Sequence, residues 1–344
     1  MNYVNLILLS STWELSHRKG LYTHLNKKLS EWSEVIFIES PFSLLIHTFI
    51  KFRSRVLRKF KKESTDDSIK TFMPIIIFHH KIWNKFKFTL KIDSKLLAFQ
   101  TKRFLKKKHS LRKKLIWASY PFDYPFIELM EPEFRIYDFY DNFNYDEDGN
   151  FNPRKNYFNK LIIEKSDLVF CTAIKLYEFA KIVNANSYYL PNGHNINFSN
   201  QEHNLDLKLN GKVIGYLGNI RDWIDFDLVK ELAMRLNHDQ YLVFIGPVEK
   251  SVLKEITLLK KNKQFRHLRA VKYNEIFSYI KNFDIGIIPF KTNNFMNGVF
   301  PNKFFEYVAS NITIVTTDLP DMSQYKNVIN IAKTQEEFIS MCWI

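Results

Sequence analysis

The sequence predicts an α/β protein made of two doubly wound domains, each with a parallel β-sheet covered by helices. Its 344 residues suit two domains of ordinary size. Short apolar, β-branched or aromatic runs alternate with segments of helical spacing, a pattern typical of βα units. The alternation stops at Pro191-Asn192-Gly193 and the polar stretch behind it, and then resumes, so we expect two separate series of strands.

The first series occupies residues 1–192, which we assign to an N-terminal Rossmann-like domain. Between its first two strands, His17–Trp32 has helical spacing, with Leu21, Leu25 and Leu29 on one face. The predicted strands are Tyr3–Ser10, Glu34–Glu39, Thr71–Phe78, Lys114–Ser119, Phe134–Phe139 and Leu168–Thr172.

The second series follows a linker predicted at residues 193–210 and forms a C-terminal Rossmann-like domain at 211–344. The run Ile285–Pro289 is almost wholly apolar, as in strands buried on both faces. In such sheets ligands bind beyond the carboxyl ends of the strands. The predicted strands are Val213–Gly218, Tyr241–Ile245, Leu268–Lys272, Ile285–Phe290, Thr313–Thr317 and Val328–Ile331, and the predicted helices include Asp227–Leu236, Tyr273–Lys281 and Lys303–Ser310.

The composition excludes several classes of protein. A hydrophobic share of 46% with 16% aromatic residues excludes global disorder. Cys171 and Cys342 lie far apart and match no metal-ligand spacing, so neither a disulfide framework nor a structural zinc site is expected. The first apolar run lacks a basic flank and no run approaches the roughly 18 apolar residues of a membrane span. We therefore expect a cytoplasmic protein.

Much of the net charge of +14 comes from two basic runs, Lys51–Lys62 and Lys102–Lys114. Solvated helical faces, attraction to anionic lipid and binding of nucleic acid each explain such runs. No nucleic-acid-binding motif accompanies them, so we expect no nucleic-acid partner. The apolar segment Pro41–Ile50 before the first run resembles a shallow interfacial anchor, which leaves peripheral contact with the inner face of the plasma membrane as an alternative to solvation.

The segment Phe300–Ala309 is the strongest candidate for chemistry. Pro301 favours the start of a helix, and a helix amino terminus favours an anion such as a diphosphate. Lys303 opposes the helix dipole unless it serves a negative ligand, and Glu306 could accept hydrogen bonds from a ribose diol. An amphipathic helix that buries Phe304 explains the same pattern, and the spacing leaves both interpretations open.

The segment resembles the Pro-x-Lys-x-x-Glu-Tyr-x-Ala signature of bacterial GT-B glycosyltransferases of family 4, particularly the teichuronic-acid and exopolysaccharide type. The similarity runs from about Tyr137 to Pro320. Several further motifs match in the same order, namely Tyr137-Asp138 with Asp141, Asp167–Phe170, Leu190–Gly193, Gly215–Gly218, Phe244–Pro247, Asp284–Pro289 and Thr316–Pro320. The resemblance implies the GT-B fold, with a nucleotide-sugar bound in an interdomain cleft, the first domain on the acceptor side and the second on the donor side.

The resemblance also implies a set of donor-binding residues. Glu306 matches the glutamate that holds the nucleotide ribose, and Lys303 with the amides around Asn302 would face the diphosphate. Gly218 matches the glycine at which backbone approaches phosphate, and Gly246 closes the next strand. The remaining donor-binding residues implied are Asn219, Arg221, Lys272, Tyr273, Gly298 and Pro301, of which Lys272 and Tyr273 correspond to the stretch that meets the nucleobase.

Two departures from the family pattern affect this set. Gly298 stands eight residues before Glu306, where the family has a glutamate that contacts the transferred sugar, and Asn294 and Asn297 are candidate substitutes. The family's Arg/Lys pair after the first strand of the second domain is also absent. Arg221 is expected to supply part of that charge, unless it forms an ion pair with Asp222 or Asp225 instead.

Catalytic roles are assigned to Asp138, Asp141, Lys303 and Arg221. The two aspartates follow a strand, where a carboxylate is placed for proton transfer or for binding an acceptor sugar, although Asp and Asn also cap loops. Lys303 and Arg221 would stabilise charge on the leaving diphosphate. Since the family resembled works with helix dipoles and basic residues, we expect no metal and no cofactor.

Three residues are predicted to bind the acceptor. Trp13 is placed to stack on a sugar ring, although core packing explains it equally well. Arg18 is expected to meet a pyrophosphate-linked lipid, and Tyr120 to line the same site. His79-His80 is interpreted as ordinary packing.

Together these observations predict a retaining glycosyltransferase of bacterial surface polysaccharide biosynthesis. Its donor would be a UDP- or GDP-sugar, and its acceptor a glycan or a polyprenyl-diphosphate-linked glycan. A nucleotide-sugar epimerase of the same fold and a non-catalytic nucleotide-sugar-binding homologue are the alternatives. The sequence ends at Met341-Cys342-Trp343-Ile344, so we expect the crossover helix with which GT-B proteins usually finish to be short or missing.

Overall fold

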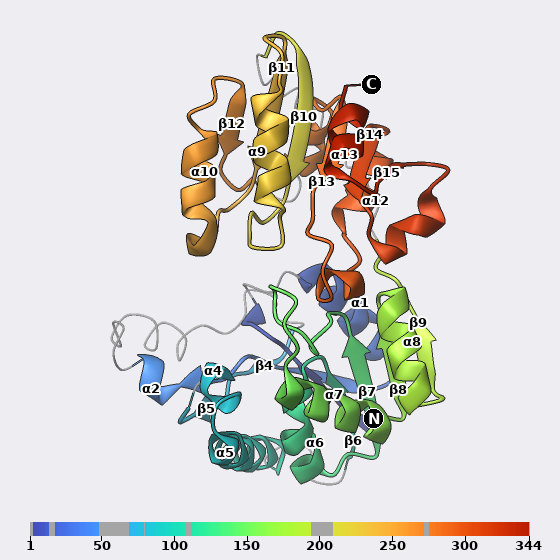
Figure 1. Cartoon of the computed structure of the whole chain (residues 1–344). Helices are drawn as coiled ribbons and strands as arrows, with labels where there is room; N and C mark the ends of the chain where they lie inside the picture. The colour runs from blue at the N-terminus through green and yellow to red at the C-terminus, as the bar shows by residue number, and fades with distance from the viewer. Residues whose placement is uncertain are drawn as a thin grey trace. The chain divides into compact units, whose positions relative to one another are not determined.

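The structure, a computed structural model, describes residues 3–13, 18–47, 69–78, 80–106, 112–193, 209–271 and 275–343, with only the backbone at 19, 46, 47, 80 and 81. The chain divides into two compact units. The first contains Met1–Asn144, Phe151–Thr172 and Leu176–Tyr189, and the second contains Tyr145–Asn150, Ala173–Lys175 and Leu190–Ile344 (Figure 1). Most of the predicted linker, residues 194–208, lies outside the described residues.

The first unit is built on a seven-stranded parallel sheet in the order β4-β2-β1-β6-β7-β8-β9. The order reverses between β1 and β6, which makes this the switch point of a doubly wound sheet. The strands are β1 Tyr3–Leu8, β2 Glu34–Ile38, β4 Thr71–Phe72, β6 Lys113–Ala118, β7 Phe134–Phe139, β8 Leu168–Cys171 and β9 Ser187–Tyr189.

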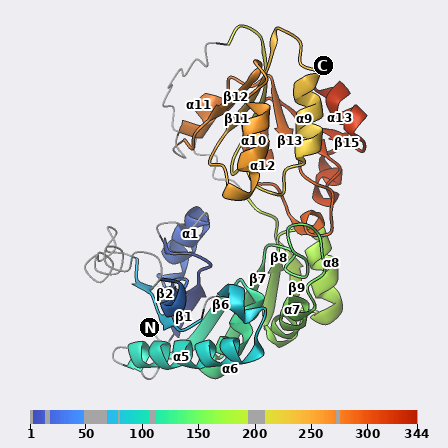
Figure 2. The ribbon, with the colours of Figure 1, turned by 60° about the vertical axis from the view of Figure 1, so that its left-hand side comes forward.

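Helices cover both faces of this sheet (Figure 2). They are α1 Lys19–Leu29, α2 Leu44–His47, α4 His80–Trp83, α5 Lys87–Lys106, the 3₁₀ turn η2 Pro121–Asp123, α6 Tyr124–Met130, α7 Pro153–Lys165 and α8 Ile174–Val183. The side of α1 that carries Tyr22 packs on Phe37 of β2, in a cluster that also contains Ile7.

The prediction of one strand over Thr71–Phe78 was wrong. Pro74 has no N–H to donate to a ladder, and the chain changes partner there. Before it, β4 pairs with β2; after it, β5 (Ile75–Ile76) pairs with β3 (Phe42–Ser43) in a separate two-stranded sheet. The carbonyl of Pro74 accepts from the Phe42 N–H at 2.9 Å.

The second unit has a six-stranded parallel sheet in the order β12-β11-β10-β13-β14-β15, with its switch point between β10 and β13. The strands are β10 Lys212–Leu217, β11 Gln240–Ile245, β12 Phe265–Leu268, β13 Ile285–Ile288, β14 Thr313–Thr317 and β15 Asn330–Ala332. Its helices are α9 Phe226–Met234, η3 Lys250–Val252, α10 Leu253–Leu259, α11 Ile276–Ile280, η5 Met296–Gly298, α12 Lys303–Ala309, η6 Pro320–Tyr325 and α13 Gln335–Met341.

The strand predicted at Leu268–Lys272 begins earlier, at Phe265. Phe265 is buried and pairs with Leu242 of β11, while Arg266 next to it is exposed. This short edge strand contains two polar residues in a row, so its sequence does not show the alternation of apolar and polar residues that predicts a strand. The other strands predicted for this unit form, each within three residues of the expected ends.

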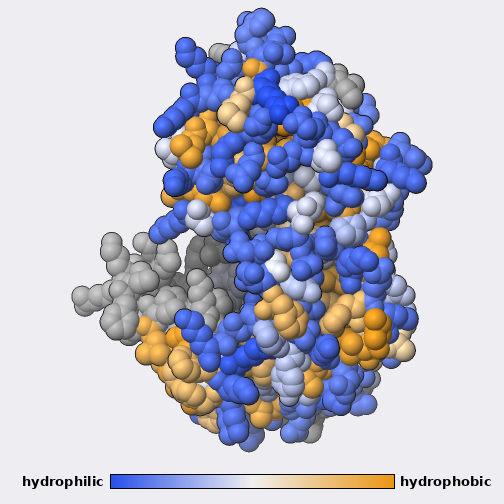
Figure 3. All heavy atoms as spheres, in the orientation of Figure 1, coloured by the Kyte–Doolittle hydropathy of each residue, from blue (hydrophilic) through white to orange (hydrophobic). Residues whose placement is uncertain are grey.

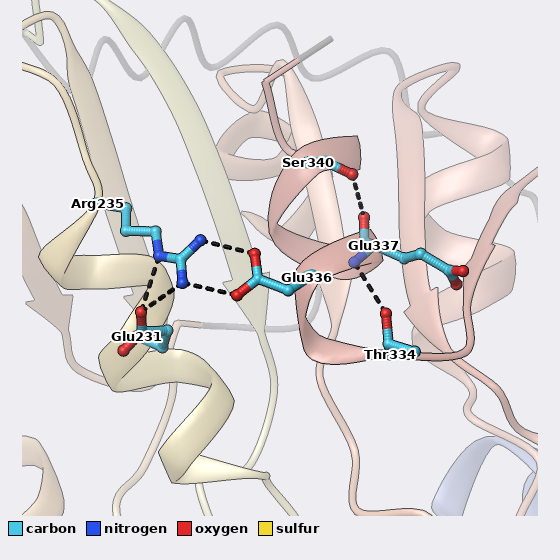
Figure 4. Close-up of polar contacts among 6 residues, drawn as sticks. All are labelled: Glu231, Arg235, Thr334, Glu336, Glu337 and Ser340. Atoms are coloured by element: carbon cyan, nitrogen blue, oxygen red, sulfur yellow. Dashed lines mark hydrogen bonds and ion pairs between the residues drawn. The ribbon is translucent and has the colours of Figure 1, made fainter.

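The last helix, α13, packs against β14 and β15. Phe338 and Ile339 enter the core, and the Thr334 side chain accepts from the Glu337 N–H at 3.1 Å as the helix cap. On its exposed side, Glu336 forms a two-pronged ion pair with Arg235 of the α9 end, at 2.7 Å for each contact (Figure 4). The structure thus confirms an α/β protein with parallel sheets in two units.

Candidate functional site

Two glycines shape the carboxyl edge of the second sheet. Gly218 follows β10 with φ +137°, and Gly246 follows β11 with φ +148°. A Cβ on Gly246 would lie 2.0 Å from the Gly218 carbonyl oxygen, so no larger residue fits there without moving the backbone. The two strand-end loops therefore approach each other as bare backbone, next to the switch point.

Lys303 lies at this glycine edge. Its Nζ is 4.7 Å from the centroid of the Tyr216 ring and 4.9 Å from that of Phe290. A Cβ on Gly218 would be 3.0 Å from the same Nζ. Within the described chain no carboxylate pairs with this ammonium, so its charge is held by two aromatic faces and is available to an anion.

Tyr307 fixes the helix that carries Lys303. It is fully buried, and its hydroxyl accepts from the Leu217 N–H at 3.0 Å at the end of β10. Burial raises the pKa of this phenol well above its ordinary value, so it stays neutral. Gly286 in β13 makes room for the ring, since a Cβ there would lie 2.7 Å from it. Helix α12 is thereby held against β10 and β13.

The other predicted residues of α12 surround this point. The helix begins at Lys303, directly after Asn302, whose side chain is exposed and makes no cap hydrogen bond. Pro301 is buried and its carbonyl accepts from the Phe304 N–H at 3.0 Å. Glu306 lies in the same turn as Lys303 and is partly exposed.

Gly298 ends the short turn η5 and is buried. The Asn293 side chain caps this turn by accepting from the Met296 N–H at 2.9 Å. The candidate substitutes for the family glutamate differ in exposure: Asn294 is exposed and Asn297 partly buried.

Arg221 is occupied by two carboxylates other than those considered from the sequence. Its Nη2 lies 3.1 Å from Glu147 and its Nε 2.7 Å from Glu249, and its guanidinium stacks 4.6 Å over Trp223. Asp225 instead caps α9, accepting from Leu228 N–H at 3.0 Å. The positive charge of Arg221 is therefore already balanced in this structure, unlike that of Lys303.

Two further donor residues are placed differently. Asn219 uses its carbonyl to accept the Tyr216 hydroxyl at 2.8 Å, which secures the loop after β10. Lys272 and Tyr273 lie outside the described residues. The sequence analysis missed Tyr216 and Phe290, the rings under Lys303; an aromatic residue near each strand end was the available signal.

In the first unit, the carboxyl ends of β1, β6 and β7 carry a buried polar network. Arg18 Nη1 contacts Asp138 Oδ2 at 2.5 Å, and the guanidinium lies 4.6 Å over Tyr140. Burial lowers the pKa of Arg18, but the Asp138 carboxylate outweighs it and leaves the pKa raised. Arg18 and Asp138, predicted separately as acceptor-binding and catalytic, are thus one ion pair.

The neighbouring candidates have ordinary contacts. Trp13 is only 6% exposed, and its ring centroid lies 4.7 Å from that of Phe37. These contacts agree with the core-packing alternative for Trp13. Tyr120 is half-buried, with ring edges against Phe122 and Phe143. The carbonyl of Asp141, a partly exposed residue, accepts from the Phe143 N–H at 2.8 Å.

Asp123, in the turn after β6, was not considered in the sequence analysis. Burial raises the pKa of its carboxyl to about 7, although the Tyr120 N–H donates to it at 3.1 Å. Groups that titrate near neutrality are frequent at proton-transfer sites. The Ser119-Tyr120-Pro121 strand end was the signal, since the next two residues include this aspartate.

In the described ranges no three His, Cys, Asp or Glu side chains gather as a metal-binding group. None of the helices described there is both long and apolar enough to span a bilayer. The basic run Lys51–Lys62 and His79 lie outside the described residues, and only the backbone of His80 is described.

Comparison with known proteins supports the architecture. Residues 197–327 match the family model for glycosyl transferases group 1. Over 114 residues the chain is 30% identical to TuaH of Bacillus subtilis (strain 168), which is described as a teichuronic acid biosynthesis glycosyltransferase. That match spans 33% of this chain and only 28% of TuaH.

Solved structures match almost the whole chain at low sequence identity. Sucrose-phosphate synthase from Thermosynechococcus elongatus has a TM-score of 0.73 at 10% identity, over 98% of this chain and 88% of its own. HepE of Anabaena in complex with UDP and glucose has a TM-score of 0.68 at 9% identity, over 98% and 88%. UDP-forming α,α-trehalose-phosphate synthase from Burkholderia vietnamiensis has a TM-score of 0.65 at 10% identity, over 98% and 90%.

These matches confirm the resemblance inferred from the motifs. The segment that carries Lys303 lies inside the matched family model, and both parallel sheets belong to the shared architecture. Residues 197–327 thus match the family model for glycosyl transferases group 1, within a chain that has the GT-B fold of two Rossmann-like units.

Proposed function

We propose that the protein is a glycosyltransferase that moves a sugar from a UDP- or GDP-sugar to a glycan or a polyprenyl-diphosphate-linked glycan. One observation carries the proposal: the Lys303 ammonium, which pairs with no carboxylate of the described residues, lies over Tyr216 and Phe290 beside the bare backbone of Gly218. A cation next to exposed backbone at a switch point suits a diphosphate. The match to the glycosyl transferases group 1 model over this segment supports the same assignment.

In the proposed reaction the bond between the anomeric carbon and the diphosphate oxygen breaks, and negative charge develops on the leaving diphosphate. The acceptor hydroxyl oxygen forms the new bond to the anomeric carbon, and its proton leaves with the diphosphate. Lys303 stabilises that charge, and Glu306 accepts hydrogen bonds from the nucleotide ribose. No metal or cofactor takes part in this scheme. HepE binds UDP in its solved complex and the trehalose-phosphate synthase is UDP-forming, which makes a UDP-sugar the first donor to test.

The acceptor is assigned to the first unit. There the Arg18–Asp138 pair, with Tyr22 and Tyr140, forms the buried polar network at the carboxyl edge of the sheet. We propose that the acceptor binds near this pair, through its reacting hydroxyl or through its polyprenyl diphosphate. We also propose that the transfer retains the anomeric configuration of the sugar. The similarity to TuaH supports a role in bacterial surface polysaccharide synthesis. The location that we propose, the cytoplasmic side of the membrane, comes from the sequence analysis.

A nucleotide-sugar-binding protein without transfer activity is the second candidate. Gly298 favours it, because a glycine at this position offers no carboxylate to the transferred sugar. Asn294, two residues before η5, is exposed and is a candidate substitute for the missing carboxylate.

The donor site is tested by isothermal titration of UDP and GDP into the full chain. Lys303→Met keeps the apolar stem and removes the charge, so we expect nucleotide affinity to fall about 10- to 100-fold, as for a lost charge-assisted hydrogen bond. Lys212→Met is the matched control, because Lys212 lies at the opposite end of β10. Equal losses in both variants, or none in either, would remove Lys303 from the site.

Activity is tested separately by following nucleotide release from a panel of UDP- and GDP-sugars, with and without a polyprenyl-diphosphate-linked glycan. A transferase releases the nucleotide faster when the acceptor is present. Conversion of the sugar without acceptor would indicate the epimerase, and binding without either reaction would indicate the non-catalytic homologue.

A further inference from the structure

Helix α5 exposes an apolar stripe to solvent. Phe88, Ile92 and Phe99 are 57%, 40% and 61% exposed. Successive residues of an α-helix are about 100° apart, so these three lie within roughly 40° of one another. Phe86, just before the helix, is exposed as well. Large side chains aligned in this way on one helix mark an interaction surface, unlike scattered ones.

The opposite side of α5 shows that this exposure is built into the helix. It buries Asp93, whose carboxylate accepts the Ile77 N–H at 2.8 Å and the Trp83 indole N–H at 2.7 Å. Gln100 exchanges two hydrogen bonds with the backbone of Ile75, at 3.1 and 2.7 Å. Polar side chains face inward and fix the rotation of the helix, and the phenylalanines are held outward as a result.

Basic residues flank the stripe. Lys91, Lys95, Lys102, Arg103 and Lys106 are all exposed on the same half of α5, and we call these five residues with Phe88, Ile92 and Phe99 the outer face of α5. The one acidic residue of the helix, Asp93, is buried on the other side. Among the described residues no carboxylate pairs with any of the five cations.

We propose that the outer face of α5 docks on an anionic lipid bilayer. Aromatic side chains between lysines whose long stems reach outward suit the interface between headgroups and acyl chains. Five cations without an exposed acid complement anionic headgroups, and they disfavour a second copy of the same face. Exposed Leu44 and Leu45 of α2 add apolar surface in the same unit, and Figure 3 shows hydrophobic side chains gathered over α2 and α4.

This surface specifies the membrane contact that the basic composition suggested, and it shares Lys102, Arg103 and Lys106 with the second basic run of the sequence. The apolar stripe on α5 is the new observation, and it became visible only once the buried side of the helix was known. The docking does not depend on the donor site, so vesicle binding and nucleotide binding fail independently.

The test is sedimentation of the full chain with vesicles of phosphatidylcholine alone or with 30% phosphatidylglycerol (about one anionic lipid in three). We expect binding to the anionic vesicles, weakened by salt. Phe99→Ser should reduce the partition coefficient about tenfold, and Lys91→Gln and Lys95→Gln about fivefold each. Phe151→Ser and Lys160→Gln, which change an exposed phenylalanine and lysine on the α7 side of the unit, should bind like the parent.

Several outcomes would overturn the proposal. One is parent-like binding by Phe99→Ser and Lys91→Gln, and another is equal binding to neutral and anionic vesicles. A dimer in solution that Phe99→Ser dissociates would assign the face to a second copy. Circular dichroism and UDP titration of each variant separate loss of docking from loss of folding. The substitutions on α5 do not change the residues around Lys303, so a folded variant should still bind UDP.

Discussion

Lys303 and Arg221 are two cations near the same sheet edge, yet their surroundings leave them with different abilities to bind an anionic ligand. Arg221 lies between Glu147 and Glu249, whereas Lys303 lies over two aromatic rings. An ion pair neutralises a charge, while a cation–π contact leaves it available to a further ligand. At the residue scale, the diphosphate is therefore expected at Lys303.

Asp123 gives a pH-dependent prediction at this scale. Its pKa is raised to about 7 by burial, whereas an unfolded aspartate titrates near about 4. Between these values the folded state binds the extra proton, so the free energy of unfolding should fall as the pH rises from about 4 to about 7. Asp123→Asn should remove this contribution.

The measurement is urea unfolding at a series of pH values. The parent should lose more stability between pH 5 and pH 8 than Asp123→Asn does. Asp239→Asn, at an exposed aspartate of the second unit, should follow the parent. Parallel curves for the parent and Asp123→Asn would contradict the raised pKa.

At the scale of elements, helices are positioned by single buried side chains. The Tyr307 hydroxyl holds α12 against the end of β10, and Asp93 and Gln100 hold α5 against the segment around β5. In each case a polar group reaches an N–H at a strand end. The orientation of Lys303 and of the outer face of α5 follows from these contacts.

Helix α13 allows surface and core contributions to be compared. Its Glu336 pairs with Arg235 in the open (Figure 4), which lowers the pKa of the Glu336 carboxyl. Phe338 of the same helix is fully buried. Exposed ion pairs contribute little because water and salt screen them. We expect Glu336→Gln to shift the urea midpoint slightly, and Phe338→Ala to cost about 3–5 kcal/mol. A larger loss of stability from Glu336→Gln than from Phe338→Ala would show that the ion pair, and not the core, holds α13 against the sheet.

At the scale of the molecule, each unit has its own sheet and its own hydrophobic core. A ligand that binds one folded unit should stabilise that unit by mass action, by about 2.7 kcal/mol at a hundredfold excess over Kd. The proposed donor site lies wholly in the second unit. UDP should therefore protect its amide hydrogens selectively.

Hydrogen exchange followed by mass spectrometry tests this selectivity. Added UDP should slow exchange in peptides covering β10, β13 and α12, and leave those covering β1 and β2 unchanged. Lys303→Met should reduce the protection at the same UDP concentration, because the variant binds UDP more weakly. Protection confined to the first unit would move the nucleotide away from Lys303.

The alternation of apolar runs and helical segments by itself determined the architecture, because a strand or a helix records its buried face in its own periodicity. Phe134–Phe139 and Thr313–Thr317 were predicted to the residue. The helix predicted at Lys303–Ser310 likewise forms, as Lys303–Ala309. Where a short segment lacks that periodicity, as at Phe265–Leu268, or a proline interrupts it, as at Pro74, the prediction was wrong.

Only the tertiary structure decided which groups meet. Arg221 contacts Glu147, which is 74 residues away in the sequence, and Arg18 contacts Asp138, which is 120 residues away. Sequence spacing carries no information about such pairs, because they arise where the sheet order brings separate strand ends together. The same holds for the rings beneath Lys303 and for the outward phenylalanines of α5, whose orientation depends on what the rest of each helix buries.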